Sequence, residues 1–376
     1  MGFFMARKTI KKEKNSPLKG SPFVFKQRGE TNFPPSPDLL ARETRCFFTE
    51  IFFRNRPEWK VLAFESPDTR AIIACYEFKN KQLVFTPGRR HLGNERKIDT
   101  RWGLHQIMKH SFFQAAIKKV SGSEIIIVPV LGEGIVFDLG YNFYLATQKE
   151  PGNTIIVSAS HKPNSQGHKG LSSHLNYYRA EGKERFRKIR LAIIGDSIAG
   201  GRNLRVVLEK LFIDFPHLEK IIILSIHATL TGIQRIAEKL PSSVSFTVFT
   251  FNAPLYANPE NDYDCFWPSD HQQQTIPDPR DTELLKAIYG PKAYKRLCIA
   301  GDFASCFLTP FQANQVTDNQ LRKLGLKARE ISVTPITFEF LKEIGFKPEE
   351  LLPASTVLKL KKAGINSLAQ VDQLVF

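Results

Sequence analysis

Five short apolar runs with no alternating polar positions constrain the fold of this chain more than any other feature. They are residues 125–130, 154–157, 191–194, 221–226 and 244–251. Strands with this pattern are buried on both faces, which is typical of a parallel sheet covered by helices. Helical segments over residues 204–212 and 231–240 follow the third and fourth runs, so right-handed strand–helix–strand units are expected. The predicted fold class is therefore α/β with a mainly parallel sheet.

The formal charge of +16 is concentrated near the amino end. Residues 1–30 carry 8 basic and 2 acidic side chains, and residues 31–120 carry 16 and 9, so these two segments hold thirteen of the sixteen excess charges. The rest of the chain is nearly balanced. A polyanion is therefore expected to meet the amino-terminal third. The alternative is that the basic run near the amino end is a solvated tail.

Composition and pattern divide the chain into four predicted parts. Residues 1–37 mix Lys, Pro, Gly and Ser and are expected to form a basic flexible tail. Residues 38–94 are expected to be a β-rich extension, in which the runs within 59–85 form a small antiparallel sheet. Residues 95–300 are the α/β core, which begins with a predicted helix over 101–120. Residues 301–376 are expected to form a small all-α module.

A weak repeat marks that carboxy-terminal module. Gly325, Gly345 and Gly364 each follow a short helical pattern and precede an apolar residue, as in a Schellman cap. Residues 356–375 resemble helix-hairpin-helix modules that bind the nucleic-acid backbone. The charge of residues 301–376 is only +1, which favours a packing role over nucleic-acid binding.

Cysteine and hydropathy patterns indicate the compartment. The five cysteines form no C-x-x-C pair, which favours buried thiols in the cytoplasm or an equivalent reducing compartment. The longest apolar run is far shorter than the roughly 18 residues of a membrane span. The amino end has no signal-peptide pattern, so no membrane association is expected.

The loop after the third apolar run is the sharpest candidate site. It reads R-L-A-I-I-G-D-S-I-A-G-G-R-N-L over residues 190–204 and leads from a buried strand into a helix. Backbone N–H groups and the helix dipole at such a junction favour a phosphate. Asp196 is predicted to accept hydrogen bonds from ribose hydroxyls or to help hold Mg²⁺, and Arg202 to clamp phosphate oxygens. An ordinary strand-to-helix turn is the competing interpretation.

In its order of motifs the chain resembles the phosphoribosyltransferase family, closest to the uracil branch. The resemblance spans about residues 95–275 and rests on residues 127–134, 176–179, 191–203, 222–235 and 258–268. It implies binding of phosphoribosyl diphosphate with Mg²⁺ and transfer of ribose 5-phosphate to a pyrimidine-type base. By the same resemblance, residues 158–170 are a mobile loop that closes over the diphosphate; a disordered surface loop is the alternative.

The resemblance also assigns roles to individual residues. Asp196 is the implied catalytic residue and metal ligand, with Tyr263 near the base. The diphosphate is implied to lie against Gly132, Glu133 and Gly134, and the 5-phosphate against Gly200, Gly201, Arg202 and Asn203.

Three further hypotheses stand beside this resemblance. Gly132 stands where the family has an Arg, and Gly195 stands at the other expected acidic position. A catalytically decayed regulator is therefore one alternative; it would bind nucleic acid or a partner protein through residues 1–120 and 301–376. A homodimer is the remaining partner hypothesis. A Gly-Asp-Ser hydrolase with Ser197 as nucleophile is a minor alternative. The one D-x-x-H pair in this chain, Asp214 and His217, follows the serine too closely to supply its base and orienting acid.

Overall fold

Six parallel strands form most of the largest sheet in the part of the chain that the structure describes. This computed structural model describes residues 22–26, 28–33, 44–71, 74–87, 93–164, 167–179, 188–254, 256–257, 265–266, 278–294 and 337–375. The strand order is β1-β3-β4-β13-β12-β11-β7-β8, and β2 also pairs with β3. The strands are β1 (Phe23–Phe25), β2 (Gly29–Phe33), β3 (Thr44–Phe53), β4 (Arg56–Glu65), β7 (Ile125–Pro129), β8 (Asn153–Thr154), β11 (Leu191–Gly195), β12 (Lys220–Ser225) and β13 (Ser245–Phe251).

The predicted α/β class and parallel sheet are confirmed. Strands β4, β13, β12, β11, β7 and β8 run parallel to one another in that order. Four of the five apolar runs coincide with β7, β11, β12 and β13. The run at 154–157 is divided, because Thr154 ends the edge strand β8 and Ile156 begins β9 (Ile156–Asn164). β9 forms a separate antiparallel hairpin with β10 (Gly167–Arg179).

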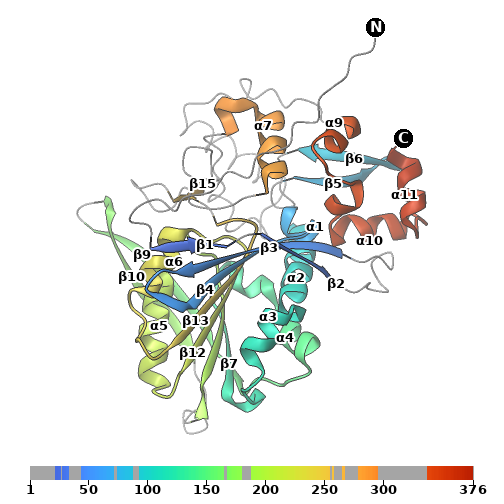
Figure 1. The fold of residues 1–376 in the computed structure, drawn as a ribbon. Coiled ribbons are helices and arrows are strands. Elements are labelled where there is room, and N and C mark those ends of the chain that lie inside the picture. The colour runs from blue at the N-terminus through green and yellow to red at the C-terminus, as the bar shows by residue number, and fades with distance from the viewer. Residues whose placement is uncertain are drawn as a thin grey trace.

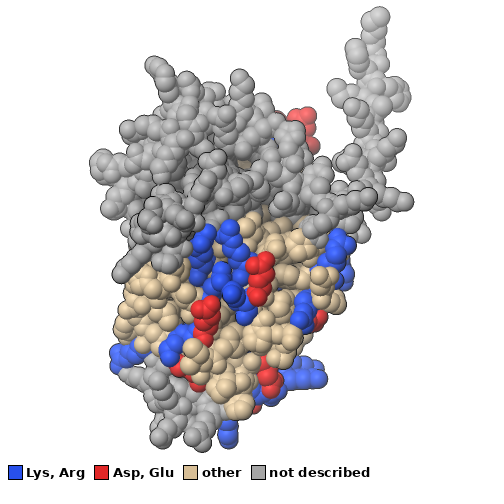
Figure 2. All heavy atoms as spheres, turned by 90° about the vertical axis from the view of Figure 1, so that its left-hand side faces the viewer, with Lys and Arg blue, Asp and Glu red and all other residues tan. Residues whose placement is uncertain are grey.

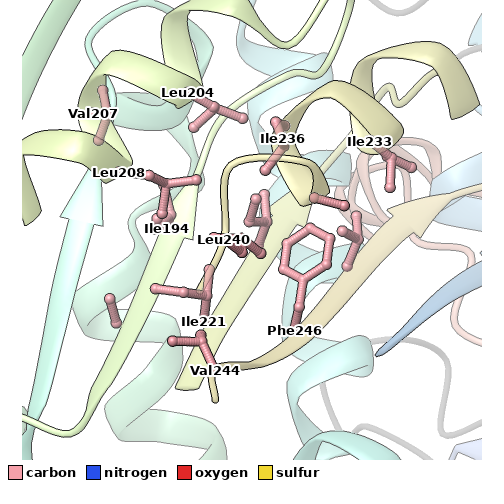
Figure 3. Close-up of a cluster of buried hydrophobic side chains, with 14 of the residues drawn as sticks. Ile194, Leu204, Val207, Leu208, Ile221, Ile233, Ile236, Leu240, Val244 and Phe246 are labelled. Carbon is pink, nitrogen blue, oxygen red and sulfur yellow. The ribbon is translucent and has the colours of Figure 1, made fainter. Parts of the chain in front are cut away.

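Alternate residues of the central strands face two separate helical layers (Figure 1). One face packs against α5 (Arg202–Asp214) and α6 (Leu230–Ala237), where Leu208, Ile236 and Phe246 meet (Figure 3). The other face packs against α2, α3 and α4. Burial of both faces is why these strands lack polar alternation. The second layer comprises α2 (Gly93–Lys109), α3 (Ser111–Ile117) and α4 (Leu139–Thr147), with short 3₁₀ turns η1 (Gly122–Glu124) and η2 (Glu133–Phe137) beside it.

The helix predicted over 101–120 is two helices. α2 ends at Lys109, and the side chain of His110 then accepts a hydrogen bond from the N–H of Phe112 at 3.2 Å, which caps α3. No helix of the described residues is long and apolar enough to cross a membrane.

The amino-terminal strands belong to the main sheet. β1 and β2 both pair with β3, so residues 23–25 and 29–33 are strands of the main sheet, whereas a flexible tail was predicted there. β4 contains the run at 59–64 and pairs parallel with β13, so this run does not join the small antiparallel sheet predicted for it. The other two runs do pair, as the hairpin of β5 (Ala74–Lys79) and β6 (Gln82–Pro87). Sequence pattern identified the strands β4, β5 and β6 but not β1 and β2, and the partners of all five are set by tertiary contacts.

A third layer lies above the sheet in Figure 1 and contains most of the carboxy-terminal helices. It comprises β5, β6, α7 (Pro279–Tyr294), α9 (Phe338–Glu343), the 3₁₀ turn η7 (Pro348–Leu351), α10 (Ala354–Lys362) and α11 (Leu368–Val375). We call this layer the cap. Its members share one apolar cluster, in which Tyr76, Leu284 and Val357 are buried. The described part of the predicted 301–376 module is therefore helical and shares its core with β5, β6 and α7.

Two of the three predicted glycine caps are confirmed. Gly345 and Gly364 have φ of 88° and 84°, the left-handed conformation that glycine adopts most readily. The N–H of Phe346 donates to the carbonyl of Leu341, and that of Ile365 to Leu360, as in Schellman motifs. Gly325 lies outside the described residues.

Buried acids attach the amino end of α10 to the core. Asp68, in α1 (Pro67–Arg70), accepts a hydrogen bond from the N–H of Ala354 at 2.7 Å. Asp99, in α2, accepts from the N–H and the hydroxyl of Ser355 at 2.8 and 2.9 Å. Carboxylates at a helix amino end stabilise it through these N–H groups and the helix dipole. α10 is the first helix of the segment that resembles a helix-hairpin-helix module. Its amino end is thus bound to protein carboxylates, in agreement with a packing role.

Asp278, just before α7, is the centre of a buried ion network beneath the cap. Its carboxylate lies within 2.6–3.0 Å of guanidinium nitrogens of Arg70, Arg28 and Arg280. Arg28 also contacts Glu65 at 2.6 Å. Burial alone would raise the pKa of Asp278, but the three arginines outweigh it and hold the pKa at about 2. The network therefore connects the segment before β2, the end of β4, α1 and α7 through one carboxylate.

Removing the Asp278 carboxylate will leave buried guanidinium groups without their shared counter-ion. We expect Asp278→Ala to lower the free energy of unfolding by about 3–5 kcal/mol, the usual result of breaking a buried ion pair from one side. Urea unfolding measures this. The matched control is Asp372→Ala on the exposed side of α11, which is expected to change stability by less than about 0.5 kcal/mol. Equal stability of the two variants would contradict the proposed importance of the network.

Candidate functional site

The loop after β11 is attached to the loop after β12 by several hydrogen bonds. The N–H of Ile198 donates to the carbonyl of His227 at 2.7 Å, and the N–H of Thr229 donates back to Ile198 at 2.9 Å. The hydroxyl of Thr229 donates to the carbonyl of Ala199 at 2.6 Å. Because β11 and β12 are neighbouring parallel strands, these loops meet at the carboxyl edge of the sheet, where ligands bind in open α/β folds.

Close backbone packing holds the second half of this loop against α6. A Cβ on Gly201 would lie less than 3.0 Å from the carbonyl oxygen of Gly232, and Gly201 has φ of 72°. Arg235 of α6 donates to the carbonyl of Gly200 at 3.3 Å. Gly201 is the N-cap of α5 and has no side chain to satisfy the first N–H groups of that helix. The predicted phosphate loop is thus a fixed turn whose N-cap residue gives α5 no side-chain cap.

The loop after β7 contacts the end of β11. The N–H of Val130 donates to the carbonyl of Gly195 at 3.0 Å, and a Cβ on Gly134 would lie less than 3.0 Å from that carbonyl oxygen. Gly132 has φ of 121°, which only glycine adopts readily, and nothing lies within 4 Å of its Cβ position. The structure therefore places the predicted residues Gly132, Glu133 and Gly134 next to the start of the loop that contains Asp196.

Apolar side chains occupy the space around Gly195, where the family resemblance expects a second acid. A Cβ at this position would lie less than 3.0 Å from side-chain carbons of Leu139 and Phe137. Both side chains belong to the buried cluster under α2–α4. An acidic side chain does not fit at position 195 without movement of this cluster, so Asp196 is the one acid that this strand end supplies.

Burial sets the ionisation of Asp196. It raises the pKa of the carboxyl from 3.8 to about 7, against the lowering effect of the hydrogen bond from the N–H of Ser197. That N–H lies 2.8 Å from Oδ1. Near neutral pH the half-buried carboxyl therefore exists in both forms: the charged form accepts hydrogen bonds from hydroxyls, and the neutral form also donates one.

A buried Arg–His contact, which sequence reasoning missed, lies behind these loops. Arg96, near the start of α2, has Nη2 2.8 Å from Nε2 of His227. His227 follows β12, and its carbonyl accepts hydrogen bonds from Ile198 and from the Ser225 hydroxyl. Arg96 and His227 are 131 residues apart in sequence, so no local motif indicated the contact. It ties α2 to the loop pair at the carboxyl edge.

Arginines give the α5–α6 side a positive surface. Figure 2 shows Lys and Arg side chains gathered near the centre of the face that lies on the left of Figure 1, with acidic groups beside them. Among the arginines of α5 and α6, Arg202, Arg205 and Arg235 are partly exposed. Because Arg235 reaches the carbonyl of Gly200, the positive charge extends to the predicted phosphate loop. Asn203, in the first turn of α5, has a buried side-chain oxygen with no hydrogen-bond partner among the described residues.

The predicted mobile loop at 158–170 belongs to the β9–β10 hairpin. Its base packs on α5, where Tyr178 contacts the apolar cluster and Lys210 lies 5.2 Å from the Tyr178 ring centroid. Burial raises the pKa of the Tyr178 hydroxyl, and the nearby Asp214 raises it further. The hairpin is therefore anchored at its base beside α5.

The described residues do not form a metal site by themselves. No group of three or more His, Cys, Asp and Glu side chains that can hold an ion occurs among them. Mg²⁺ is usually held by one or two carboxylates together with substrate phosphates, and this strand end offers Asp196 alone. The Mg²⁺ assignment stays a prediction.

The hydrolase arrangement is not assembled. Asp214 ends α5, whereas Ser197 precedes its start, and the 13-residue helix between them is roughly 20 Å long. Asp214 pairs with Lys210 at 2.7 Å. The D-x-x-H pair of Asp214 and His217 is therefore at the opposite end of α5 from the serine. Tyr263, predicted near the base, lies outside the described residues.

Comparisons with known proteins do not identify a family for this chain. No family model matches the sequence, and no curated protein does. Among solved structures, the chain is similar to an adenine phosphoribosyltransferase from Trypanosoma brucei in complex with AMP, pyrophosphate and ribose-5-phosphate. The identity is 16% and the TM-score 0.32, over 52% of this chain and 84% of that one. What is established is an α/β fold with a mostly parallel sheet.

The raised pKa of Asp196 makes stability depend on pH. Between pH 4 and 7 the folded protein keeps a proton that unfolded Asp196 releases, so this group lowers stability as pH rises. Asp196→Asn keeps an acceptor for the Ser197 N–H and lacks the titration. We expect the variant to match wild type at pH 4 and to exceed it by roughly 1–2 kcal/mol at pH 8, less than the full pKa change implies because the side chain is half-buried.

Urea unfolding of both proteins across this pH range measures the difference. Asp372→Asn, at an exposed position on α11, is the control and is expected to follow wild type throughout. A constant difference between Asp196→Asn and wild type at all pH values would contradict the assignment.

Proposed function

We propose that the chain binds phosphoribosyl diphosphate at the carboxyl edge of its parallel sheet. The observation that carries the proposal is the loop after β11, which is fixed to the loop after β12 and opens α5 at an N-cap glycine beside Arg202. Such a turn presents backbone N–H groups and a positive dipole end to a phosphate. The order of motifs that resembles the phosphoribosyltransferases supports the same ligand.

Each part of the site has a role in this proposal. The N–H groups from Gly201 to Asn203 hold the 5-phosphate, and Arg202 adds a charged donor to it. Asp196 accepts hydrogen bonds from the ribose hydroxyls when ionised. The open backbone at Gly132, together with Gly134, lies beside the ribose end of the site and receives the diphosphate. Glu133 lies between these glycines and stays part of the predicted diphosphate contact.

Transfer of ribose 5-phosphate to a pyrimidine-type base is the finer form of this proposal. The surroundings here would stabilise an oxocarbenium-like transition state through charge on Asp196 and the bound phosphates. Two implied groups are absent from the chain: an arginine at position 132 and an acid at position 195. Because the space at position 195 is filled by Leu139 and Phe137, we expect binding to be retained more fully than turnover.

Calorimetry with phosphoribosyl diphosphate, with and without MgCl₂, tests the proposal. We expect binding to wild type, and a roughly tenfold or greater loss of affinity in Asp196→Ala and in Arg202→Ala, because each removes a charge-assisted hydrogen bond. Lys239→Ala removes an exposed positive charge just beyond α6 and is the matched control. The absence of heat at millimolar ligand would overturn the proposal, as would an equal loss in the control. A parallel assay of pyrophosphate release with uracil measures transfer.

A regulator that binds nucleic acid is the second candidate function. The filled space at Gly195 favours a role without catalysis, and the charge excess before residue 121 favours a polyanion. Residues 23–25 and 29–33 are strands of the sheet and Arg28 is part of the Asp278 network, so the test must spare them. Residues 1–21 contain six basic and one acidic side chain and lie outside the described part.

Removal of residues 1–21 is therefore the appropriate truncation. We expect the full chain to shift labelled RNA or DNA at low salt, with affinity falling steeply as salt increases, and the truncated chain to show weaker binding and a smaller salt slope. Circular dichroism of both proteins establishes that the fold is kept. Salt-independent binding, or equal binding by the two proteins, would contradict a polyanion site in this segment.

A further inference from the structure

The first turns of α2 contact both the cap and the loops at the carboxyl edge of the sheet. Toward the cap, Glu95 pairs with Lys359 of α10, and Asp99 accepts two hydrogen bonds from the amino end of the same helix. Toward the loops, Arg96 lies 2.8 Å from the imidazole of His227. Because successive helical residues are about 100° apart, the three α2 side chains lie within about 100° of one another around the helix. One rigid segment therefore makes both sets of contacts.

Hydrogen-bond chemistry determines the protonation state of His227. Arg96 and His227 are 1% and 2% exposed, and the 2.8 Å contact joins Nη2 of the first to Nε2 of the second. A guanidinium has donors only, so Nε2 must accept and cannot carry a proton. His227 is therefore a neutral imidazole with its proton on Nδ1. An imidazolium here would set two cations against each other out of contact with water, which is costly.

His227 in turn positions the backbone of the loop after β11. Its carbonyl accepts the hydrogen bond from the N–H of Ile198 at 2.7 Å, and the next residue, Ala228, forms a parallel bridge with Ile198. Ile198 lies between Asp196 and Gly201, the N-cap of α5. A shift of His227 therefore displaces the backbone between the candidate carboxyl and the helix end that is proposed to receive a phosphate.

The cap also contacts this loop directly. Ala199 packs against the apolar cluster of the cap, and so do Ile98 and Trp102 of α2. The loop is thus fixed by the cap as well as by the loop after β12. α2 connects these two supports, because it binds α10 and, through Arg96, also His227. In a close-packed interior a displacement of one such contact is transmitted to the next.

We infer that Arg96 is a positioning residue for the predicted phosphate loop, which it holds in place through the neutral imidazole of His227. Arg96 acts through the loop backbone: it fixes His227, whose carbonyl fixes Ile198 on the approach to the N-cap of α5. The role belongs to the pair, since neutral His227 supplies an acceptor to the buried guanidinium. Its effect on ligand affinity rests on the proposed function, whereas the protonation state and the loop contact do not.

Nitrogen-15 NMR of the imidazole side chains at neutral pH tests the protonation state without any ligand. The signals of His227 are those that are lost in His227→Gln. We expect the pattern of a neutral ring that is protonated on Nδ1 and unprotonated on Nε2. A ring protonated on Nε2, or an imidazolium, would overturn the inference, because neither can accept a hydrogen bond from Arg96 at that atom.

Two substitutions separate the acceptor atom from the bulk of the ring. His227→Gln keeps a side-chain oxygen that can accept from Arg96, whereas His227→Leu fills similar space without an acceptor. We expect hydrogen exchange of the amides at 197–200 to be at least ~10-fold faster than wild type in the Leu variant and close to wild type in the Gln variant. Exchange within β12 is the internal reference for global unfolding. An unchanged loop in His227→Leu, or a rise equal to that of β12, would contradict the inference.

Calorimetry with phosphoribosyl diphosphate then measures the effect on the site. We expect affinity to fall at least ~10-fold in His227→Leu and in Arg96→Met, and to stay within ~3-fold of wild type in His227→Gln. The matched control is His110→Leu, which removes another buried imidazole that accepts a hydrogen bond, at the start of α3. This variant is expected to lower stability and to leave affinity unchanged.

The outcomes separate positioning from a purely structural contact. A purely structural contact would lower stability in His227→Leu and leave the affinity of the folded protein unchanged, which would overturn the inference. An equal loss of affinity in His227→Gln or in His110→Leu would overturn it as well. Absence of binding to wild type would refute the proposed function alone, and the NMR and exchange measurements would still decide the role of Arg96.

Discussion

The ion network around Asp278 is the interaction on which the arrangement of the cap over the sheet depends. Three arginines from three parts of the chain share this one carboxylate, and Glu65 at the end of β4 pairs with one of them, Arg28. The energetic value of such a network lies less in net stability than in the large penalty for any arrangement that leaves one member buried alone. The cap is therefore held over the carboxyl edge of the sheet in one arrangement. Asp68 and Asp99 reinforce it through the amino end of α10.

The same edge is the place where chemistry is possible. Both faces of the parallel sheet are filled by apolar side chains, so the loops after β7, β11 and β12 are left to present polar groups. These loops are fixed to one another by backbone hydrogen bonds and by glycine contacts that admit no side chain. A fixed turn is suited to binding a phosphate. Apolar side chains around Gly195 leave no room for a second acidic residue at this edge. In the proposed function we therefore expect ligand binding to be retained more fully than catalysis.

Sequence reasoning predicted the local features well and the long-range ones poorly. The apolar runs at β7, β11, β12 and β13 and the glycine caps at Gly345 and Gly364 were predictable, because each depends on a few neighbouring residues. The loop at 196–203 was predictable for the same reason. The pairing of β4 with β13 and the contact of Arg96 with His227 were not, because residues far apart in sequence create them. The placement of β1 and β2 in the sheet was missed because short strands in a Pro- and Lys-rich segment carry almost no periodicity.

By itself, the sequence determined that this protein has an α/β core with a parallel sheet, a glycine-rich turn into a helix after one central strand, and an excess of positive charge toward its amino end. These follow from hydrophobic periodicity, glycine placement and charge counting, which are local or additive properties. Only the tertiary structure decided that the amino-terminal strands extend this sheet, that the cap shares one core, and that position 195 has no room for an acid. Each of these depends on which distant side chains come within a few ångströms, and that is settled by packing the whole chain at once.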